Sequence, residues 1–270
     1  MGLRGDGTLV RVSWDHWARA ERAEIAAADR WRTIRELDSG GPVARLDGCE
    51  VVSFASNDYF GLSQHPAVRA AAHEAIERWG TGAGSARLIA GSRPVHSELE
   101  RELADWKGAE RALLFPTGFA ANLGVLSVVG GPDVTIISDQ LNHASIIDGA
   151  HAALGPEPPR TGASVLRVGT LSKMLGSVGG FVAGRGPLVD LIINRARSFI
   201  FTTAPAPATT AAALAALRVL RSGAGDALRA RLAALTSRVR PGHPSPIIPV
   251  VLGGEQISRL LTELAAVVPA

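Results

Sequence analysis

The chain has 270 residues, of which 46% are apolar and 20% charged, and this composition excludes an intrinsically disordered protein. Its 28 basic and 25 acidic residues are interspersed, without a basic run or interleaved aromatics, which argues against a nucleic-acid-binding surface. The single cysteine, Cys49, excludes an internal disulfide, and no cluster of ligands predicts a metal site. With neither a signal-peptide pattern nor a long apolar run, we expect a cytoplasmic protein.

Helices and strands are predicted to alternate along most of the chain. Predicted helices lie within residues 14–38, 66–79, 95–106, 119–129, 143–150 and 187–198, and onward to about 235. Predicted strands lie at residues 51–54, 112–115, 134–138, 165–168, 180–183 and 247–252. This alternation indicates an α/β fold with a mostly parallel central sheet. Ala and Leu dominate after about Pro205, so we expect an N-terminal arm (1–50), a large domain (51–204, shortened between 149 and 165) and the remainder of a small C-terminal domain (205–270).

Lys173 is the first candidate for chemistry. It follows an apolar strand, and the glycines 176, 179 and 180 leave room for a planar ring beside it. A lysine amine held in a partly dry pocket can form a Schiff base with a carbonyl compound. The hydroxyls of Thr170 and Ser172 are available to a phosphate group. A surface lysine in a loop is the alternative, and the local pattern alone does not decide between the two.

Three further clusters are candidates for the same site. Gly118 stands where a strand passes into a helix, and backbone amides at a helix N-terminus attract anions. His143 follows a predicted strand, where an imidazole can stack on a ring or act as an acid or base. Asp148 and His151 are three residues apart and would share one face of a helix. Taken singly, each of these clusters is also compatible with an ordinary turn or cap.

Taken together, six phrases of this sequence occur in the same order in one family. They are Ser56–Leu62, Gly82–Arg87, Thr117–Asn122, Asn142–Ser145, Gly169–Lys173 and Phe199–Thr203. The chain therefore resembles the α-oxoamine synthases, which are pyridoxal-phosphate enzymes, from about residue 14 to about residue 252. The resemblance implies an aspartate-aminotransferase-like fold (PLP fold type I).

The resemblance also implies roles for individual residues. Lys173 resembles the lysine that holds the cofactor and accepts the α-proton, and His143 resembles the histidine that stacks on the ring. The remaining implied cofactor contacts are Gly118, Phe119, Asp148, His151, Thr170, Thr202 and Thr203. Thr202 and Thr203 would reach the phosphate of the partner subunit in a homodimer with a shared active site. Arg32 resembles an arginine that binds the acyl substrate, and Asn57 is expected to hold the amino-acid carboxylate.

The implied reaction is a decarboxylative condensation of an amino acid with an acyl thioester. Within the family the resemblance favours L-alanine and a pimeloyl thioester, as used in biotin synthesis. Glycine with an acetyl or succinyl thioester is the alternative within the same chemistry. A non-catalytic subunit that pairs with a longer homologue is the alternative from another class.

The sequence departs from the family pattern in two places. Only about thirty residues separate His143 from Lys173, too few for further strand–helix units of about a dozen or more residues each. The simplest explanation is an internal deletion that joins two family segments near residue 149. His151 would then match a family histidine, while Asp148 would have the right spacing by accident. Most of the small C-terminal domain also has no counterpart, so we expect exposed apolar surface and impaired activity.

Overall fold

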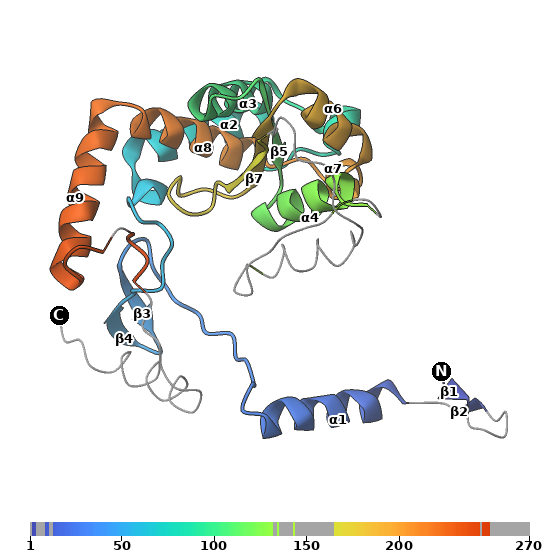
Figure 1. Ribbon diagram of the computed structural model, residues 1–270. Helices are drawn as coiled ribbons and strands as arrows, with labels where there is room; N and C mark the ends of the chain where they lie inside the picture. Colours follow the sequence, from blue (N-terminus) through green and yellow to red (C-terminus); the bar gives the residue numbers. More distant parts are fainter. Residues whose placement is uncertain are drawn as a thin grey trace.

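A three-stranded sheet forms the centre of the computed structural model (Figure 1). The structure describes residues 2–3, 9–10, 13–131, 134, 143, 165–243 and 245–248. The strand order is β5–β7–β6, with β5 at Arg111–Phe115, β6 at Arg167–Thr170 and β7 at Gly180–Gly184. Both pairs are antiparallel, so β5 and β6 run in the same direction on either side of β7.

The prediction of a mostly parallel sheet is wrong for the strand pairs that the structure describes. The connection from β6 to β7 covers only residues 171–179, and a parallel crossover needs about a dozen or more residues. A short loop therefore returns the chain antiparallel to the strand before it. Strand 134–138, helix 143–150 and most of strand 247–252 were also predicted, and they lie outside the described residues.

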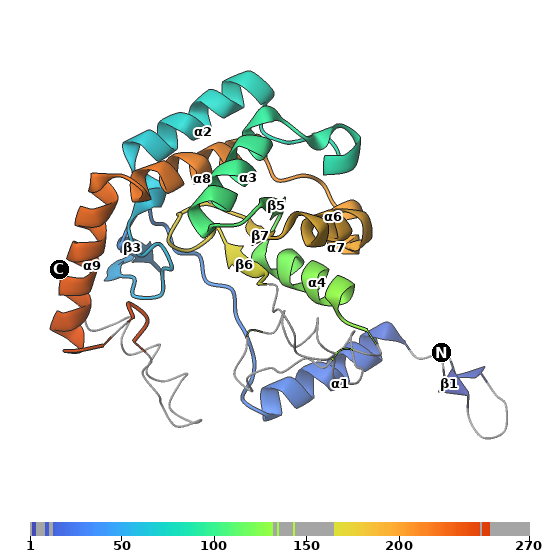
Figure 2. The same cartoon turned by 45° about the horizontal axis from the view of Figure 1, so that its top comes forward.

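Helices cover both faces of the sheet (Figure 2). One face packs against α2 (Pro66–Trp79), α3 (Pro94–Lys107) and α8 (Pro207–Leu220). The other face packs against α4 (Gly118–Val129), α6 (Gly186–Arg195) and α7 (Arg197–Ile200). Alternate residues of each strand serve the two faces, as the pleat of a strand requires. Leu114 and Phe181 face α3, while Leu113 and Val182 face α4.

The helix boundaries follow from local signals. α2 and α3 each begin with proline in the first turn, where its missing N–H costs nothing. α3 ends at Gly108, whose φ of 59° is left-handed, as the sequence pattern predicted. α4 begins where the Thr117 hydroxyl accepts a hydrogen bond from the Ala120 amide at 3.0 Å. The single helix predicted at 187–198 is instead two helices, α6 and α7, because Ala196 between them is extended.

The N-terminal part lies outside this core. α1 (Trp14–Ala27) has no buried residue, and Figure 1 shows it apart from the sheet and its helices. Two antiparallel hairpins flank it in sequence: β1 (Gly2–Leu3) with β2 (Leu9–Val10), and β3 (Val43–Leu46) with β4 (Cys49–Val52). Asp47 and Gly48 have φ of 52° and 83°, which suits the tight turn of the second hairpin. Two short turns follow, η1 (Leu62–Gln64) and η2 (Arg87–Gly91).

At the other end, α9 (Gly223–Val239) packs against α8. The predicted domain boundaries at residues 50 and 204 stay predictions. The helix that follows residue 204, α8, packs into the same hydrophobic core as α2 and α3. Among the described strands β5 and β6 are each paired on one side only. Val168 in β6 and Val165 just before it are 39% and 55% exposed, in line with the expected exposure of apolar surface. Within the described ranges, no helix has the length and apolar character to span a membrane.

Candidate active site

The loop that joins β6 to β7 carries Lys173, and hydrogen bonds within the loop fix its course. The Ser172 amide donates to the Thr170 hydroxyl at 3.1 Å, and the two hydroxyls lie 2.7 Å apart. On either side of Lys173, Leu171 and Leu175 are buried at 2% and 1% exposure. These apolar anchors hold the loop against the core and leave the lysine half-buried between them.

The same loop rests on η1. Gly176 has a left-handed φ of 57°, and a Cβ there would lie 2.4 Å from the Ser63 nitrogen. The amides of Leu62 and Ser63 donate to the Asp58 carboxylate at 2.9 and 3.1 Å. The family phrase at 56–62 therefore has a structural role. Asp58 binds the amides of η1, and η1 packs against the lysine loop at Gly176.

A cavity of about 240 Å³ opens beside Lys173 on the α3 side of the sheet. Its lining includes Tyr59, Trp106, Lys107, Thr170, Lys173 and Phe181. The Tyr59 hydroxyl donates to Asn57 Oδ1 at 3.0 Å, which connects the predicted substrate residue Asn57 to the cavity wall.

Trp106 and Lys107 are two of the lining residues that were not predicted from the sequence. Lys107 Nζ lies 3.4 Å from the centre of the Trp106 ring, within cation–π range. Burial lowers the pKa of the Lys107 ammonium, and the nearby positive charge of Arg167 lowers it further. Both residues end α3, some 60 residues before Lys173 in the chain, and no local pattern connects them with it. Tyr59 was visible only as a member of a family phrase.

The start of α4 meets the end of β6 next to this cavity. A Cβ on Gly118 would lie 3.3 Å from Thr170 Cβ and 3.4 Å from its hydroxyl oxygen. The first amides of a helix have no partner within the helix and attract anions. Gly118 and Phe119, predicted as cofactor contacts, and Thr170, predicted as a phosphate contact, are thus gathered in one place. Phe119 is 45% exposed.

The other predicted site residues that the structure describes are not part of the cavity lining beside Lys173. His143 is exposed, and Arg32 is exposed in the segment that follows α1. Thr202 is half-buried and Thr203 is exposed, and neither lines the cavity beside Lys173. Asp148 and His151 lie outside the described residues.

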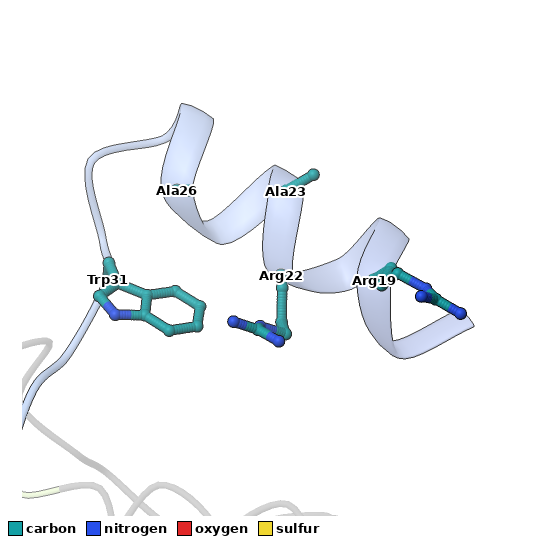
Figure 3. A pocket seen from close by; sticks show the side chains of 5 residues that line it. All are labelled: Arg19, Arg22, Ala23, Ala26 and Trp31. Atoms are coloured by element: carbon teal, nitrogen blue, oxygen red, sulfur yellow. The ribbon is translucent and has the colours of Figure 1, made fainter. Parts of the chain in front are cut away.

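A second hollow, of about 560 Å³, lies on the exposed arm (Figure 3). Its lining consists of Arg19, Arg22, Ala23, Ala26 and Trp31. The Arg22 guanidinium stands 5.2 Å from the centre of the Trp31 ring. The hollow is larger than the cavity at Lys173, but its lining holds no nucleophile and no general base. We therefore assign the chemistry to the cavity at Lys173.

Comparisons with known proteins identify relatives of the chain. The model of the family described as aminotransferase class I and II matches residues 50–159 and again residues 152–242. An 8-amino-7-oxononanoate synthase of Methylobacterium sp. (strain 4-46) is 34% identical over 325 residues, covering 93% of this chain and 85% of the relative. Another, of Anaeromyxobacter dehalogenans (strain 2CP-1 / ATCC BAA-258), is 35% identical over 336 residues, covering 93% of this chain and 83% of the relative.

These alignments also bear on the predicted deletion. They are longer than the 270 residues of the chain, so the relatives contain residues without a counterpart here. The two family matches meet at residues 152–159, close to the junction predicted near residue 149. The internal deletion predicted from the short interval before Lys173 is thereby supported.

Solved structures confirm the predicted aspartate-aminotransferase-like fold. A serine palmitoyltransferase of Sphingomonas wittichii superposes with a TM-score of 0.72 at 23% identity, covering 87% of this chain and 78% of the other. An 8-amino-7-oxononanoate synthase of Francisella tularensis gives a TM-score of 0.61 at 21% identity, covering 79% and 85%. At these identities the likeness establishes the fold alone.

Proposed function

Because the chain belongs to the aminotransferase class I and II family, within the group of 8-amino-7-oxononanoate synthases, we propose that it is a pyridoxal-phosphate-dependent acyltransferase of biotin synthesis. It joins L-alanine to a pimeloyl thioester. A bond forms between the alanine Cα and the acyl carbon, the thiol leaves, and the alanine carboxylate departs as CO2. The observation that carries this proposal is the half-buried Lys173 in a cavity next to the N-terminus of α4.

The described residues fit pyridoxal phosphate. Glycine at position 118 leaves free the space beside Thr170 that a side chain would fill. There the first amides of α4, at Gly118 and Phe119, and the Thr170 hydroxyl would hold the phosphate. Lys173 Nζ would hold the aldehyde carbon. When bound, the cofactor supplies an electron sink for the electron pair left at the amino-acid Cα.

The side chains of the cavity do the rest. Lys173 Nζ accepts the proton from the alanine Cα. The Asn57–Tyr59 pair, joined by its 3.0 Å hydrogen bond, orients the alanine carboxylate at the cavity wall. The apolar rings of Trp106 and Phe181 restrict water on the α3 side.

The remaining predicted residues complete the proposal. His143 stacks on the cofactor ring, and Arg32 binds the acyl substrate. Asp148 and His151, in the shortened segment, contact the cofactor. The protein works as a homodimer in the cytoplasm, where Thr202 and Thr203 of one copy reach the cofactor phosphate of the other.

Cofactor binding gives the first test. The purified chain is mixed with pyridoxal phosphate, its visible absorption is recorded, and borohydride then fixes the adduct for peptide mass spectrometry. We expect one labelled lysine, Lys173, and loss of the band in Lys173→Ala. Lys107→Ala is the matched control, because it removes the other lysine of the same cavity. A label that persists in Lys173→Ala would refute the assignment.

Turnover gives the second test. L-alanine with pimeloyl thioester is compared with glycine plus acetyl or succinyl thioester, with the released thiol as the measurement. We expect the L-alanine and pimeloyl pair to be preferred. A chain that takes up the cofactor at Lys173 but releases no thiol with any pair would contradict the proposed reaction.

A further inference from the structure

His96 is a fully buried polar side chain that the proposed chemistry does not use. It stands in the first turn of α3 with 0% exposure. Its Nδ1 accepts a hydrogen bond from the Arg93 amide at 2.8 Å, so the ring proton is on Nε2. That nitrogen therefore donates to the Pro205 carbonyl at 2.8 Å. The ring is neutral, uses both nitrogens, and joins two points that are 109 residues apart in sequence.

Pro205 belongs to a segment, residues 201–206, that we call the threonine loop. Ala204 and Pro205 are buried, whereas Phe201 is 69% exposed and Thr203 is exposed. The loop therefore exposes Thr203 and leaves Thr202 half-buried, next to a buried base at Ala204 and Pro205. His96 forms one of the contacts that fix this base.

The second contact comes from residues 80–85, which we call the glycine loop. The Ala204 amide donates to the Ser85 carbonyl at 3.0 Å. The Arg93 side chain donates to the Ala83 carbonyl at 3.3 Å, while the Arg93 amide binds His96. Hydrogen bonds thus connect α3, the glycine loop and the threonine loop into one unit. Both loops contain family phrases that the cavity at Lys173 does not include.

We propose that His96 is a positioning residue, which holds the threonine loop where Thr202 and Thr203 reach the cofactor phosphate of a second copy of the chain. This inference rests on the proposed function. It deepens that function by naming the buried group on which the shared site depends. His96 itself touches neither cofactor nor substrate.

Two variants separate the hydrogen bond from mere burial. An asparagine amide reaches about as far as Nδ1, so His96→Asn keeps the acceptor for Arg93 and loses the donor to Pro205. A glutamine amide reaches about as far as Nε2, so His96→Gln keeps that donor. Loss of one net hydrogen bond corresponds to about a tenfold effect. The expected difference between Asn and Gln is therefore about tenfold in whatever the loop controls.

The first measurement needs no cofactor. Hydrogen exchange is followed in peptides that span the threonine loop and, for comparison, α9. In His96→Asn we expect about tenfold faster exchange at the Ala204 amide, with wild-type rates in His96→Gln and unchanged rates in α9. Equal rates in wild type and His96→Asn would overturn the proposal. If His96→Asn does not fold, Arg93→Met loosens the same unit from the glycine loop and serves in its place.

The second measurement uses mixed dimers. A His96→Asn chain is paired with a Lys173→Ala chain, so the one competent lysine is served by the intact threonine loop of its partner. We expect cofactor affinity about tenfold below wild type in the His96→Asn homodimer and restored in the mixed dimer. The matched control pairs the same His96→Asn chain with a Lys173→Ala, His96→Asn double variant, which should stay weak. Equal affinities in both pairs would overturn action across the dimer.

The two measurements distinguish this inference from the proposed function. A wild-type chain that takes up no pyridoxal phosphate would refute the function, and with it the role across the dimer. Exchange rates would still show whether His96 fastens the loop. Normal uptake with equal affinities in both mixed dimers would leave the function intact and refute the inference alone.

Discussion

Gly180 is the point where the sheet and the start of α4 touch. A Cβ at this position would lie 2.6 Å from the Thr117 carbonyl oxygen and 2.7 and 2.8 Å from the Gly118 Cα and nitrogen. All three neighbours are backbone atoms, which cannot rotate away as a side chain can. Gly180→Ala therefore requires β7 or the first turn of α4 to move.

The size of the effect follows from this geometry. Overpacking a well-packed site costs about 1–3 kcal/mol, and rigid backbone neighbours place Gly180→Ala near the upper end. Gly118→Ala meets the Thr170 side chain at 3.3 and 3.4 Å, a contact that a small shift relieves, so we expect a loss of about 1 kcal/mol. Gly82 has no atom within 4 Å of an added Cβ, and Gly82→Ala should change stability little or raise it by a few tenths of a kcal/mol.

Urea unfolding followed by circular dichroism compares the three variants, and pyridoxal phosphate titration gives a second ranking. Gly180→Ala should be the least stable. Gly118→Ala should lose more cofactor affinity than its small loss of stability explains, because its methyl group occupies the space of the phosphate. Gly180→Ala as stable as Gly82→Ala would refute the reasoning from the close contact.

Three further predictions concern groups that are buried or half-buried. Glu100 pairs with Arg87 through both carboxylate oxygens, at 2.8 and 3.1 Å, and accepts a hydrogen bond from the Leu114 amide at 2.9 Å. Glu100→Ala should therefore lower the free energy of unfolding, measured in urea, by about 3–5 kcal/mol. A loss below about 1 kcal/mol would contradict this. Burial lowers the pKa of His96; the hydrogen bond to the Pro205 carbonyl opposes this, and the positive charge of Arg87 adds to the lowering. The unfolded state then binds the proton more readily than the folded state. The free energy of unfolding should therefore fall as the pH drops below about 6.5, by up to about 1.4 kcal/mol per pH unit. His96→Gln should remove this contribution to the pH dependence of stability. Asp58→Ala removes the acceptor of two η1 amides, so the unfolding free energy should fall by about 1–3 kcal/mol and cofactor affinity should fall with it; normal affinity would show that η1 does not support the lysine loop.

The sequence predicted well what local chemistry decides. Proline in the first turn and Gly108 at the end define α3, and both signals lie within a few residues of the boundary that they set. The lysine loop was likewise predicted, because a short apolar strand precedes it; the strand was expected at 165–168 and is found at Arg167–Thr170. Gly118 and Thr170, each weak evidence alone, proved to be neighbours: a Cβ added to Gly118 would lie 3.3 Å from Thr170 Cβ.

The parts that were missed depend on tertiary contacts. Trp106 and Lys107 read as the ordinary end of an amphipathic helix, and only the packing of α3 on the sheet brings them to Lys173. His96 likewise shows no pattern that points to Pro205, its partner 109 residues away. The short loop between β6 and β7 could have predicted that β7 runs antiparallel to β6. The alternation of strands and helices along the chain favoured a parallel sheet instead.

The internal deletion should affect the two parts of the proposed reaction, cofactor attachment and turnover, to different extents. Contacts that hold the lysine loop come from η1, from the start of α4 and from β7, all of which lie outside the shortened interval between His143 and Lys173. We propose that cofactor attachment depends on these contacts, whereas the carboxylate proposed to tune the ring nitrogen, Asp148, belongs to the shortened interval. We therefore expect full attachment of the cofactor at Lys173 in the wild-type chain, together with thiol release that is slow but still measurable. A chain that loses both together would show instead that the missing strands were needed to hold Lys173.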